Sequence, residues 1–353
     1  MSILFAILLF SFLIVTHELG HFVAAKLSGV QVNEFSIFMG PAIFKKKIGE
    51  TLYSLRLIPL GGYCAMEGED GDSDNPRAFD KAAWWKRFII LIAGASMNFI
   101  TGLIFLGIYF APVEQYAVPV IASVEQQCSM GGAQGIQVGD EILKVDSERV
   151  YTASNLELLL TLDPQDSHDF LVRRAGEKLL LSDVPTERRE FPDGMGGTSL
   201  RYGLSFQIRD NSVGGVFDQV WRSTADTVRL VRLSLQMLLT GKAGFKDLGG
   251  PIAIVDQMAQ VADASETTMQ AFRSLIFFGA FIAINLAVMN LLPIPALDGG
   301  RVVCLLLTTA VEGITHKKVN PKYEGYLHAT GMFLLLGLMA LVMFKDIWVI
   351  FKR

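Results

Sequence analysis

The sequence contains few cysteines and few charged residues for its length. Only 3 of its 353 residues are cysteine, which excludes a disulfide framework of the kind that holds small secreted proteins together. Cys64, Cys128 and Cys304 have no zinc-ligand spacing to one another, and we interpret them as incidental. Charged residues make up 19% and hydrophobic residues 51% of the chain, a composition that is rare in soluble domains and predicts membrane-spanning helices.

Four apolar stretches are long enough to cross the roughly 30 Å hydrocarbon core of a lipid bilayer. They are residues 1–27, 86–111, 272–292 and 326–344. The first has no basic n-region and no small-residue cleavage site, so we interpret it as a retained span rather than a signal peptide. The net charge of −4 gives no general basic excess, and we expect no nucleic-acid partner.

A pentapeptide inside the first apolar stretch reads His-Glu-Leu-Gly-His. On a helix, His17 and His21 project from one face and can share a metal ion, while Glu18 lies beside them as a candidate general base. His17 lies roughly 22 Å along a helix that begins at Ser2, still inside the hydrocarbon core. The spacing therefore predicts a hydrolytic metal site at membrane depth.

A catalytic zinc usually takes three protein ligands, and the pentapeptide supplies two. The better candidate for the third is Asp298, in Asn290-Leu-Leu-Pro-Ile-Pro-Ala-Leu-Asp298-Gly-Gly, rather than His168, His316 or His328. This motif follows the third apolar stretch, where an ionisable side chain needs a strong partner such as a metal. The alternative is that Asp298 only caps a helix that begins at the next residue.

The remaining segments have distinct patterns. Residues 30–66 predict a β-hairpin with lysines at its tip, and residues 67–80 an acidic linker. Residues 216–241 carry charges at intervals of three or four, which favours an amphipathic helix in the membrane interface over a fifth span. In the second span, Gly94 and Asn98 share a face, typical either of helix packing or of a site.

The predicted fold is a polytopic α-helical membrane protein with about four transmembrane helices, a membrane-associated β-hairpin and one inserted PDZ-like α/β domain. Residues 1–111 are expected to contain the first two membrane helices, the HELGH site and the cytoplasmic hairpin loop. Residues 112–212 are expected to form the extracytoplasmic PDZ-like domain, and residues 213–250 the amphipathic interfacial helix. Residues 251–353 are expected to contain the last two membrane helices and the LDGG motif.

The charges are segregated along the chain. Residues 112–215 carry 9 Lys or Arg and 16 Asp or Glu, so their balance is −7 and that of the remainder is +3. The short connecting loops between spans one and two and between spans three and four are basic. The positive-inside rule therefore predicts that these loops are cytoplasmic, that both termini and the acidic domain lie outside, and that the site is near the cytoplasmic face.

Together, these residues resemble the site-2 protease family of intramembrane zinc metalloproteases. HELGH in the first span, LDGG after the third and a PDZ-like insert carry the resemblance over nearly the whole chain. The match is closest to the bacterial RseP-type branch in its single-PDZ form, on Pro59-Leu-Gly-Gly-Tyr63 and Gly249-Gly-Pro251-Ile. Ala95 stands where the family's second-span motif usually has proline.

The resemblance implies that His17, His21 and Asp298 bind Zn²⁺, that Glu18 is the catalytic base, and that Asn290 and Asn98 handle substrate. It also implies a bacterial inner or plasma membrane enzyme that works within the lipid bilayer. Its partners would be single-pass transmembrane proteins, such as anti-sigma factors or remnant signal peptides, already cleaved outside by another protease.

Two other functions remain open from the sequence. One is a different membrane-integral zinc peptidase that acts on soluble or misfolded chains and takes its third ligand from a later glutamate. The other is a non-catalytic membrane scaffold that displays a PDZ domain and binds no zinc. A transporter is disfavoured, because the four spans show no paired repeats.

Overall fold

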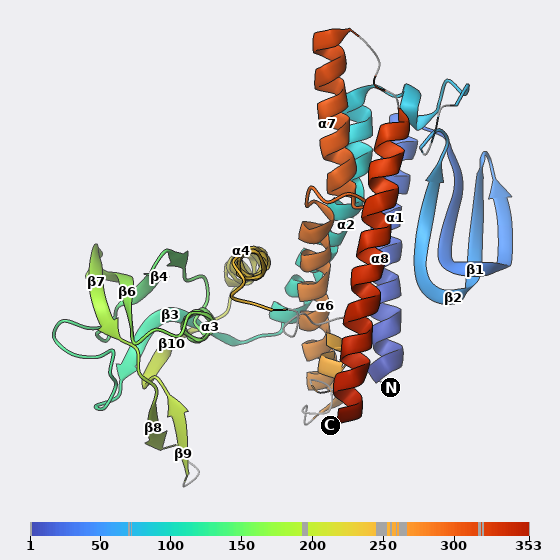
Figure 1. Ribbon diagram of the computed structural model, residues 1–353. Helices are drawn as coiled ribbons and strands as arrows, with labels where there is room; N and C mark the ends of the chain where they lie inside the picture. Colours follow the sequence, from blue (N-terminus) through green and yellow to red (C-terminus); the bar gives the residue numbers. More distant parts are fainter. Residues whose placement is uncertain are drawn as a thin grey trace. The chain divides into compact units, whose positions relative to one another are not determined.

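The computed structural model falls into two compact units, residues 1–108 with 227–353 and residues 109–226 (Figure 1). It describes residues 2–69, 71, 73–192, 197–244, 253–254, 256–258, 260, 267–316, 319 and 321–352. Gly249-Gly-Pro251-Ile, one of the segments that carried the family resemblance, lies outside the described residues.

The first unit is built around four long apolar helices, α1 (Ser2–Ser28), α2 (Trp84–Phe110), α6 (Thr268–Asn290) and α8 (Pro321–Lys352). Among the described residues, the segments long and apolar enough to cross a membrane are Ile7–Ser28, Trp84–Phe110, Thr268–Asn290 and Glu324–Trp348. Four long apolar helices therefore stand where the four spans were predicted, and the fourth is longer than the predicted 326–344.

Small residues bring three of these helices into close contact. A Cβ at Gly20 of α1 would lie 2.4 Å from the carbonyl oxygen of Ala93 in α2. A Cβ at Gly102 of α2 would lie 2.5 Å from a side-chain carbon of Ile284 in α6. Both distances are shorter than any real Cβ contact, so α1 packs on α2, and α2 on α6, only because these positions are glycine.

The connection between the third and fourth spans differs from the short basic loop that we expected. Most of it is a helix, α7 (Asp298–Thr315), which ends at His316 with a left-handed φ of 53°. The loop prediction was wrong because it rested on the basic residues at the two ends of the segment. The residues between them, Val-Val-Cys-Leu-Leu-Leu-Thr-Thr-Ala-Val, have helical amphipathic spacing.

The predicted hairpin consists of β1 (Val32–Ile48) and β2 (Thr51–Met66), and it folds back on itself. Phe35 pairs with both Cys64 and Tyr53, whereas Lys46 near the tip pairs with Tyr53 alone. The hairpin therefore forms four segments in the order 62–66, 32–37, 51–55 and 44–48, in which the two outer pairs are antiparallel and the central pair, 32–37 with 51–55, runs parallel. One of its outer edges is the segment 62–66.

A polar network holds the folded hairpin. Arg56 donates to Glu34 at 2.8 Å, to the Tyr63 hydroxyl at 2.6 Å and to the Gly40 carbonyl at 2.7 Å. Ser54 donates to the same Glu34 oxygen at 2.6 Å. Because these groups come from both strands and from the bend at Gly40, one guanidinium links all parts of the fold-back.

Ionic contacts attach the hairpin turn to the end of α1. Glu50 accepts from Lys26, near the C-terminus of α1, at 2.6 Å and from Arg77 at 2.5 Å. The guanidinium of Arg77 and the ammonium of Lys26 lower the pKa of Glu50 to about 2. After β2 come the short 3₁₀ helix η1 (Phe79–Lys81) and then α2.

The second unit is an antiparallel sheet with one short helix. The sheet order is β10-β3-β4-β6-β7, with β5 paired to β4 and a separate β8–β9 pair. The elements are β3 (Gln115–Val124), β4 (Glu141–Val145), β5 (Glu148–Arg149), α3 (Ser154–Leu162), β6 (Ser167–Arg174), β7 (Glu177–Pro185), β8 (Arg189–Pro192), β9 (Thr198–Arg201) and β10 (Leu204–Asp210). Buried Asp140 pairs with the partly exposed Arg174 of β6, 2.7 Å away.

The helix α4 (Val213–Leu239) follows the sheet. It lies within the stretch for which we expected an amphipathic helix, and it is not among the four candidate spans. Its first residues belong to the second unit and residues 227–239 to the first.

Candidate metal centre

Three metal-binding side chains meet at one point of the first unit. Asp298 Oδ2 lies 3.2 Å from His17 Nε2 and 3.4 Å from His21 Nε2, and the two imidazole nitrogens are 3.2 Å apart. Donors about 2.0–2.1 Å from a tetrahedral zinc lie roughly 3.3 Å from one another. The three predicted ligands therefore have the separations that a zinc ion requires. Asp298 lies 277 positions after His21 and 281 positions after His17 in the sequence.

The hydrogen bonding around these atoms also fits a cation. His21 Nδ1 lies 2.8 Å from the carbonyl oxygen of Ile90, which can only accept, so the imidazole proton is on Nδ1 and Nε2 presents a lone pair. Asp298 Oδ2 is buried without a hydrogen bond. Lone pairs that face one another at this distance repel unless a positive charge lies between them.

The two predicted substrate-handling asparagines lie beside His17. The amide nitrogens Nδ2 of Asn98 and Asn290 each lie 3.5 Å from His17 Nδ1, and a half-turn of either amide group would bring its oxygen to this position. A neutral His17 that offers Nε2 to a metal carries its proton on Nδ1 and needs an acceptor there. An amide oxygen from either asparagine can provide it.

The surroundings of Asn98 indicate which way its amide group is turned. Thr16 Oγ1 lies 2.9 Å from the Leu13 carbonyl oxygen and 3.3 Å from Asn98 Oδ1, and its one hydroxyl hydrogen can serve only one of these acceptors. When it serves the nearer one, at Leu13, a half-turn of the Asn98 amide group turns a donor toward Thr16. All groups are satisfied when Asn98 Nδ2 donates to Thr16 Oγ1 and Asn98 Oδ1 accepts from His17 Nδ1. Asn98 then fixes the orientation of His17.

Gly94 gives the imidazoles the space that they occupy. A Cβ at this position would lie 2.3 Å from His21 Nε2 and 2.8 Å from His17 Nε2, the two atoms that face Asp298. The sequence pattern placed Gly94 and Asn98 on one face but could not separate packing from a site. In the structure, both residues of that face contact the histidines.

A compact turn presents Asp298. After α6 ends at Asn290, residues 291–297 fold back over the first turn of α7, and a Cβ at Gly299 or Gly300 would lie 2.2–2.3 Å from carbonyl oxygens of this turn. Asp298 is the first residue of α7, and its Oδ2, which faces the two histidines, accepts no hydrogen bond from the described residues. The carboxylate is thus not used as a helix cap, the alternative left open by the sequence.

Glu18 lies between the donors and the hairpin. It follows His17 on α1, and a Cβ built at Gly62 of β2 would be 3.8 Å from its Cγ and 3.9 Å from Val15. Ser11, about two helical turns before Glu18 on α1, donates to the Pro59 carbonyl oxygen at 2.6 Å. The edge of the hairpin around residues 59–62 therefore runs along the face of α1 that carries the candidate base.

A second group of possible metal ligands, Cys304, Glu324 and His328, lies on α7 and α8. Its histidine accepts a hydrogen bond at Nδ1 from the backbone N–H of Ala296, at 3.0 Å. A neutral imidazole that accepts at Nδ1 carries its proton on Nε2, so neither nitrogen of His328 has a lone pair to give to a metal. This group is not a metal site in the arrangement described here.

Comparisons with known proteins agree with the donor set. The model of peptidase family M50 matches residues 5–338. A protein of Clostridium perfringens that carries the name of a zinc metalloprotease is 37% identical over 349 residues, 98% of each chain. The zinc metalloprotease RasP of Oceanobacillus iheyensis is 28% identical over 97% of each chain. These matches confirm the resemblance to the site-2 protease family, the metallopeptidase class and the zinc cofactor.

Replacing Gly94 by alanine tests the space around the donors. We expect Gly94→Ala to reduce the zinc content of the purified protein to near background, because the new methyl group overlaps His21 Nε2. Zinc per protein is measured by elemental analysis. Gly107→Ala on the same helix, where a Cβ meets nothing within 4 Å, should keep the wild-type zinc content.

Replacing Asp298 by asparagine tests the third ligand. Asp298→Asn removes the anionic oxygen, and we expect zinc affinity to fall about 100-fold or more in competition with a chromogenic chelator. Asp218→Asn, which alters a half-exposed carboxylate on α4, is the matched control. Full zinc occupancy in Asp298→Asn would show that another residue supplies the third ligand.

Proposed function

Because the chain belongs to peptidase family M50, the site-2 protease family, we propose that it is an intramembrane endopeptidase that cuts the transmembrane segments of other membrane proteins. The observation that carries this proposal is the position of the donors. His17 and His21 lie inside Ile7–Ser28, an apolar segment long enough to cross a bilayer, and Asp298 meets them there. A peptidase centre on such a helix is suited to peptide bonds at membrane depth.

The chain's own residues divide the work of hydrolysis. A zinc ion held by the two histidines and Asp298 supplies a Lewis acid that activates water and polarises the scissile carbonyl group. The Glu18 carboxylate accepts the proton of the attacking water and then delivers it to the leaving amide nitrogen. Asn98 keeps the His17 ring oriented, and Asn290, beside the same ring at the end of α6, is available to the substrate backbone.

A transmembrane substrate must unwind before it is cut, because a helix hides its carbonyl groups in its own hydrogen bonds. The edge segment of the hairpin near Gly62 lies against the face of α1 that carries Glu18. Within the described residues, the segment 62–66 pairs only with 32–37, so one side of it has no strand partner. We expect the unwound substrate to add to this edge as an extended strand.

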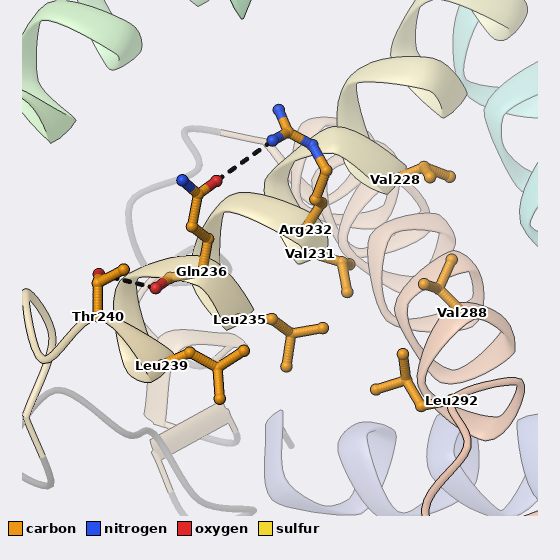
Figure 2. Close-up of a pocket in the computed structure, with 9 residues that line it drawn as sticks. All are labelled: Val228, Val231, Arg232, Leu235, Gln236, Leu239, Thr240, Val288 and Leu292. Atoms are coloured by element: carbon orange, nitrogen blue, oxygen red, sulfur yellow. Dashed lines mark hydrogen bonds between the residues drawn. The ribbon is translucent and has the colours of Figure 1, made fainter. Parts of the chain in front are cut away.

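An apolar cavity offers a place for the side chains of such a substrate. It has a volume of about 500 Å³ and lies between the C-terminal half of α4 and the end of α6 (Figure 2). Its lining residues are Val228, Val231, Arg232, Leu235, Gln236, Leu239, Thr240, Val288 and Leu292. Leu292 follows Asn290 by two positions, so the cavity adjoins the turn that carries Asp298.

The rest of the proposal concerns topology and partners. We place the protein in a bacterial inner or plasma membrane, with the metal centre near the cytoplasmic face and the 109–226 unit outside, because the loops that flank the spans are basic. The outer unit would act as a single PDZ-like domain that admits or reads a substrate already shortened outside. The amphipathic α4 suits the membrane interface rather than a fifth span.

Replacing Glu18 by glutamine tests the chemistry. We expect Glu18→Gln to lower the cleavage rate by at least about 10³-fold while zinc stays bound, because the amide cannot take up a proton. Wild-type and Glu18→Gln proteins are expressed in the same host, and the membrane-peptide fragments in each are compared by mass spectrometry. Fragments that accumulate only with the variant identify substrates, and undiminished cleavage would exclude Glu18 as the base.

Changing the substrate tests the unwinding step. Two Leu→Gly replacements near the scissile bond weaken a substrate helix by about 1 kcal/mol each. We therefore expect kcat/KM for a transmembrane peptide in detergent micelles to rise about tenfold or more. A Leu→Ala pair at the same positions removes similar bulk but keeps helix propensity, and it is the control. Equal kcat/KM values for the two peptides would show that unwinding of the substrate helix does not limit the rate of cleavage.

A further inference from the structure

The turn before Asp298 contains a residue in an unfavourable backbone conformation. Ala296 has a φ of 78°, in the left-handed region that a side chain with a Cβ rarely adopts. It lies two positions before the carboxylate that meets His17 and His21. Such a conformation persists only when neighbouring structure enforces it, and residues of this kind gather at functional sites.

One neighbour that enforces it is His328 on α8. The Ala296 backbone N–H donates to His328 Nδ1 at 3.0 Å. Since a backbone N–H can only donate, Nδ1 must be the unprotonated nitrogen of a neutral ring, and Nε2 carries the proton. Nε2 is buried, and the nearest carboxylate oxygen, from Glu324, is 3.8 Å away. The imidazole of His328 therefore contacts the turn through Nδ1, which accepts the hydrogen bond from the Ala296 N–H.

The same face of α8 packs against the residue before Ala296. A Cβ at Gly331, three positions after His328, would lie 2.5 Å from Pro295 Cβ and 2.7 Å from the Pro295 carbonyl oxygen. Glycine thus lets the α8 backbone approach the turn closely enough for the imidazole to reach the N–H of Ala296. Most of the rest of the α8 membrane segment is exposed, with only 11% of it buried inside the protein.

We propose that His328 is a positioning residue of the metal centre, which holds Ala296 in its left-handed conformation and so places the Asp298 carboxylate opposite the two histidines. His328 would act through the backbone of the turn and without contact to the metal or the substrate. This role is distinct from that of a ligand in the Cys304, Glu324 and His328 group, because the nitrogen in use points to the Ala296 N–H.

Two replacements of His328 test the role of its acceptor nitrogen. In His328→Asn, the side-chain oxygen takes the place of Nδ1 and can accept from Ala296, whereas His328→Leu has no acceptor. Zinc dissociation constants of the full-length, detergent-purified proteins are measured by competition with a chromogenic chelator. We expect His328→Leu to weaken zinc binding about tenfold or more, and His328→Asn to stay within about threefold of wild type.

A second replacement separates positioning from a general loss of packing. Glycine adopts a left-handed φ without a steric penalty, so Ala296→Gly added to His328→Leu should recover about fivefold of the lost zinc affinity. Leu327→Ala shortens an exposed side chain of the same helix and should bind zinc like wild type. The unfolding temperature of each zinc-free protein identifies any variant that fails to fold.

Three results would overturn the proposal: wild-type zinc affinity in His328→Leu, equal losses in His328→Leu and His328→Asn, or no recovery in the double variant with Ala296→Gly. The proposal rests on the metallopeptidase class of the chain rather than on its intramembrane substrate. If the wild-type protein binds zinc but cuts no transmembrane peptide, the proposed function fails while these zinc affinities still decide the role of His328.

Discussion

The arrangement of the first unit depends on one electrostatic constraint, the meeting of three metal-binding atoms at 3.2–3.4 Å in an apolar helix bundle. Two imidazole nitrogens and a carboxylate oxygen are costly to bury beside one another without a cation, and with a zinc ion they become its ligands. Two of them come from one helix turn of α1. The third comes from the start of α7, so the fold of the intervening chain must place the start of α7 beside α1.

Small residues allow this approach. Gly20 and Gly102 let α1, α2 and α6 pack with their backbones close together, and Gly94 leaves room for both imidazoles against α2. Gly299 and Gly300 let the turn after α6 lie directly on α7. Since lipid gives little hydrophobic driving force between helices, close packing and polar contacts hold such a bundle together. Glycines therefore both allow the helices to pack closely and shape the metal centre.

The polar groups around the centre each have a defined partner. His21 is oriented by the Ile90 carbonyl group, and His17 by the asparagine amides. Asp298 is placed by a turn that α8 supports through His328. Glu18 remains beside the hairpin edge, where an extended substrate would lie. The elements that orient the metal-binding side chains are thus different from the hairpin edge at which we propose that the substrate adds.

The sequence by itself determined the four apolar helices, the hairpin and the identity of the metal-binding side chains. Spans follow from the length of uncharged stretches, and the HELGH spacing places two histidines on one helix face, so local chemistry is sufficient for both. Asp298 was predicted as a ligand because a carboxylate at membrane depth needs a partner such as a metal ion. Zinc and the metallopeptidase class followed from these residues and were confirmed by the relatives.

Only the tertiary structure decided how these parts support one another. The double fold of the hairpin, the contact of Asn98 and Asn290 with His17 and the hydrogen bond from Ala296 to His328 had no local signal. The reason is physical: each of the last two depends on contacts between helices, up to 273 positions apart in the case of Asn290 and His17. Periodicity reports which face of a helix is buried, whereas the partner on that face is set by packing of the whole bundle.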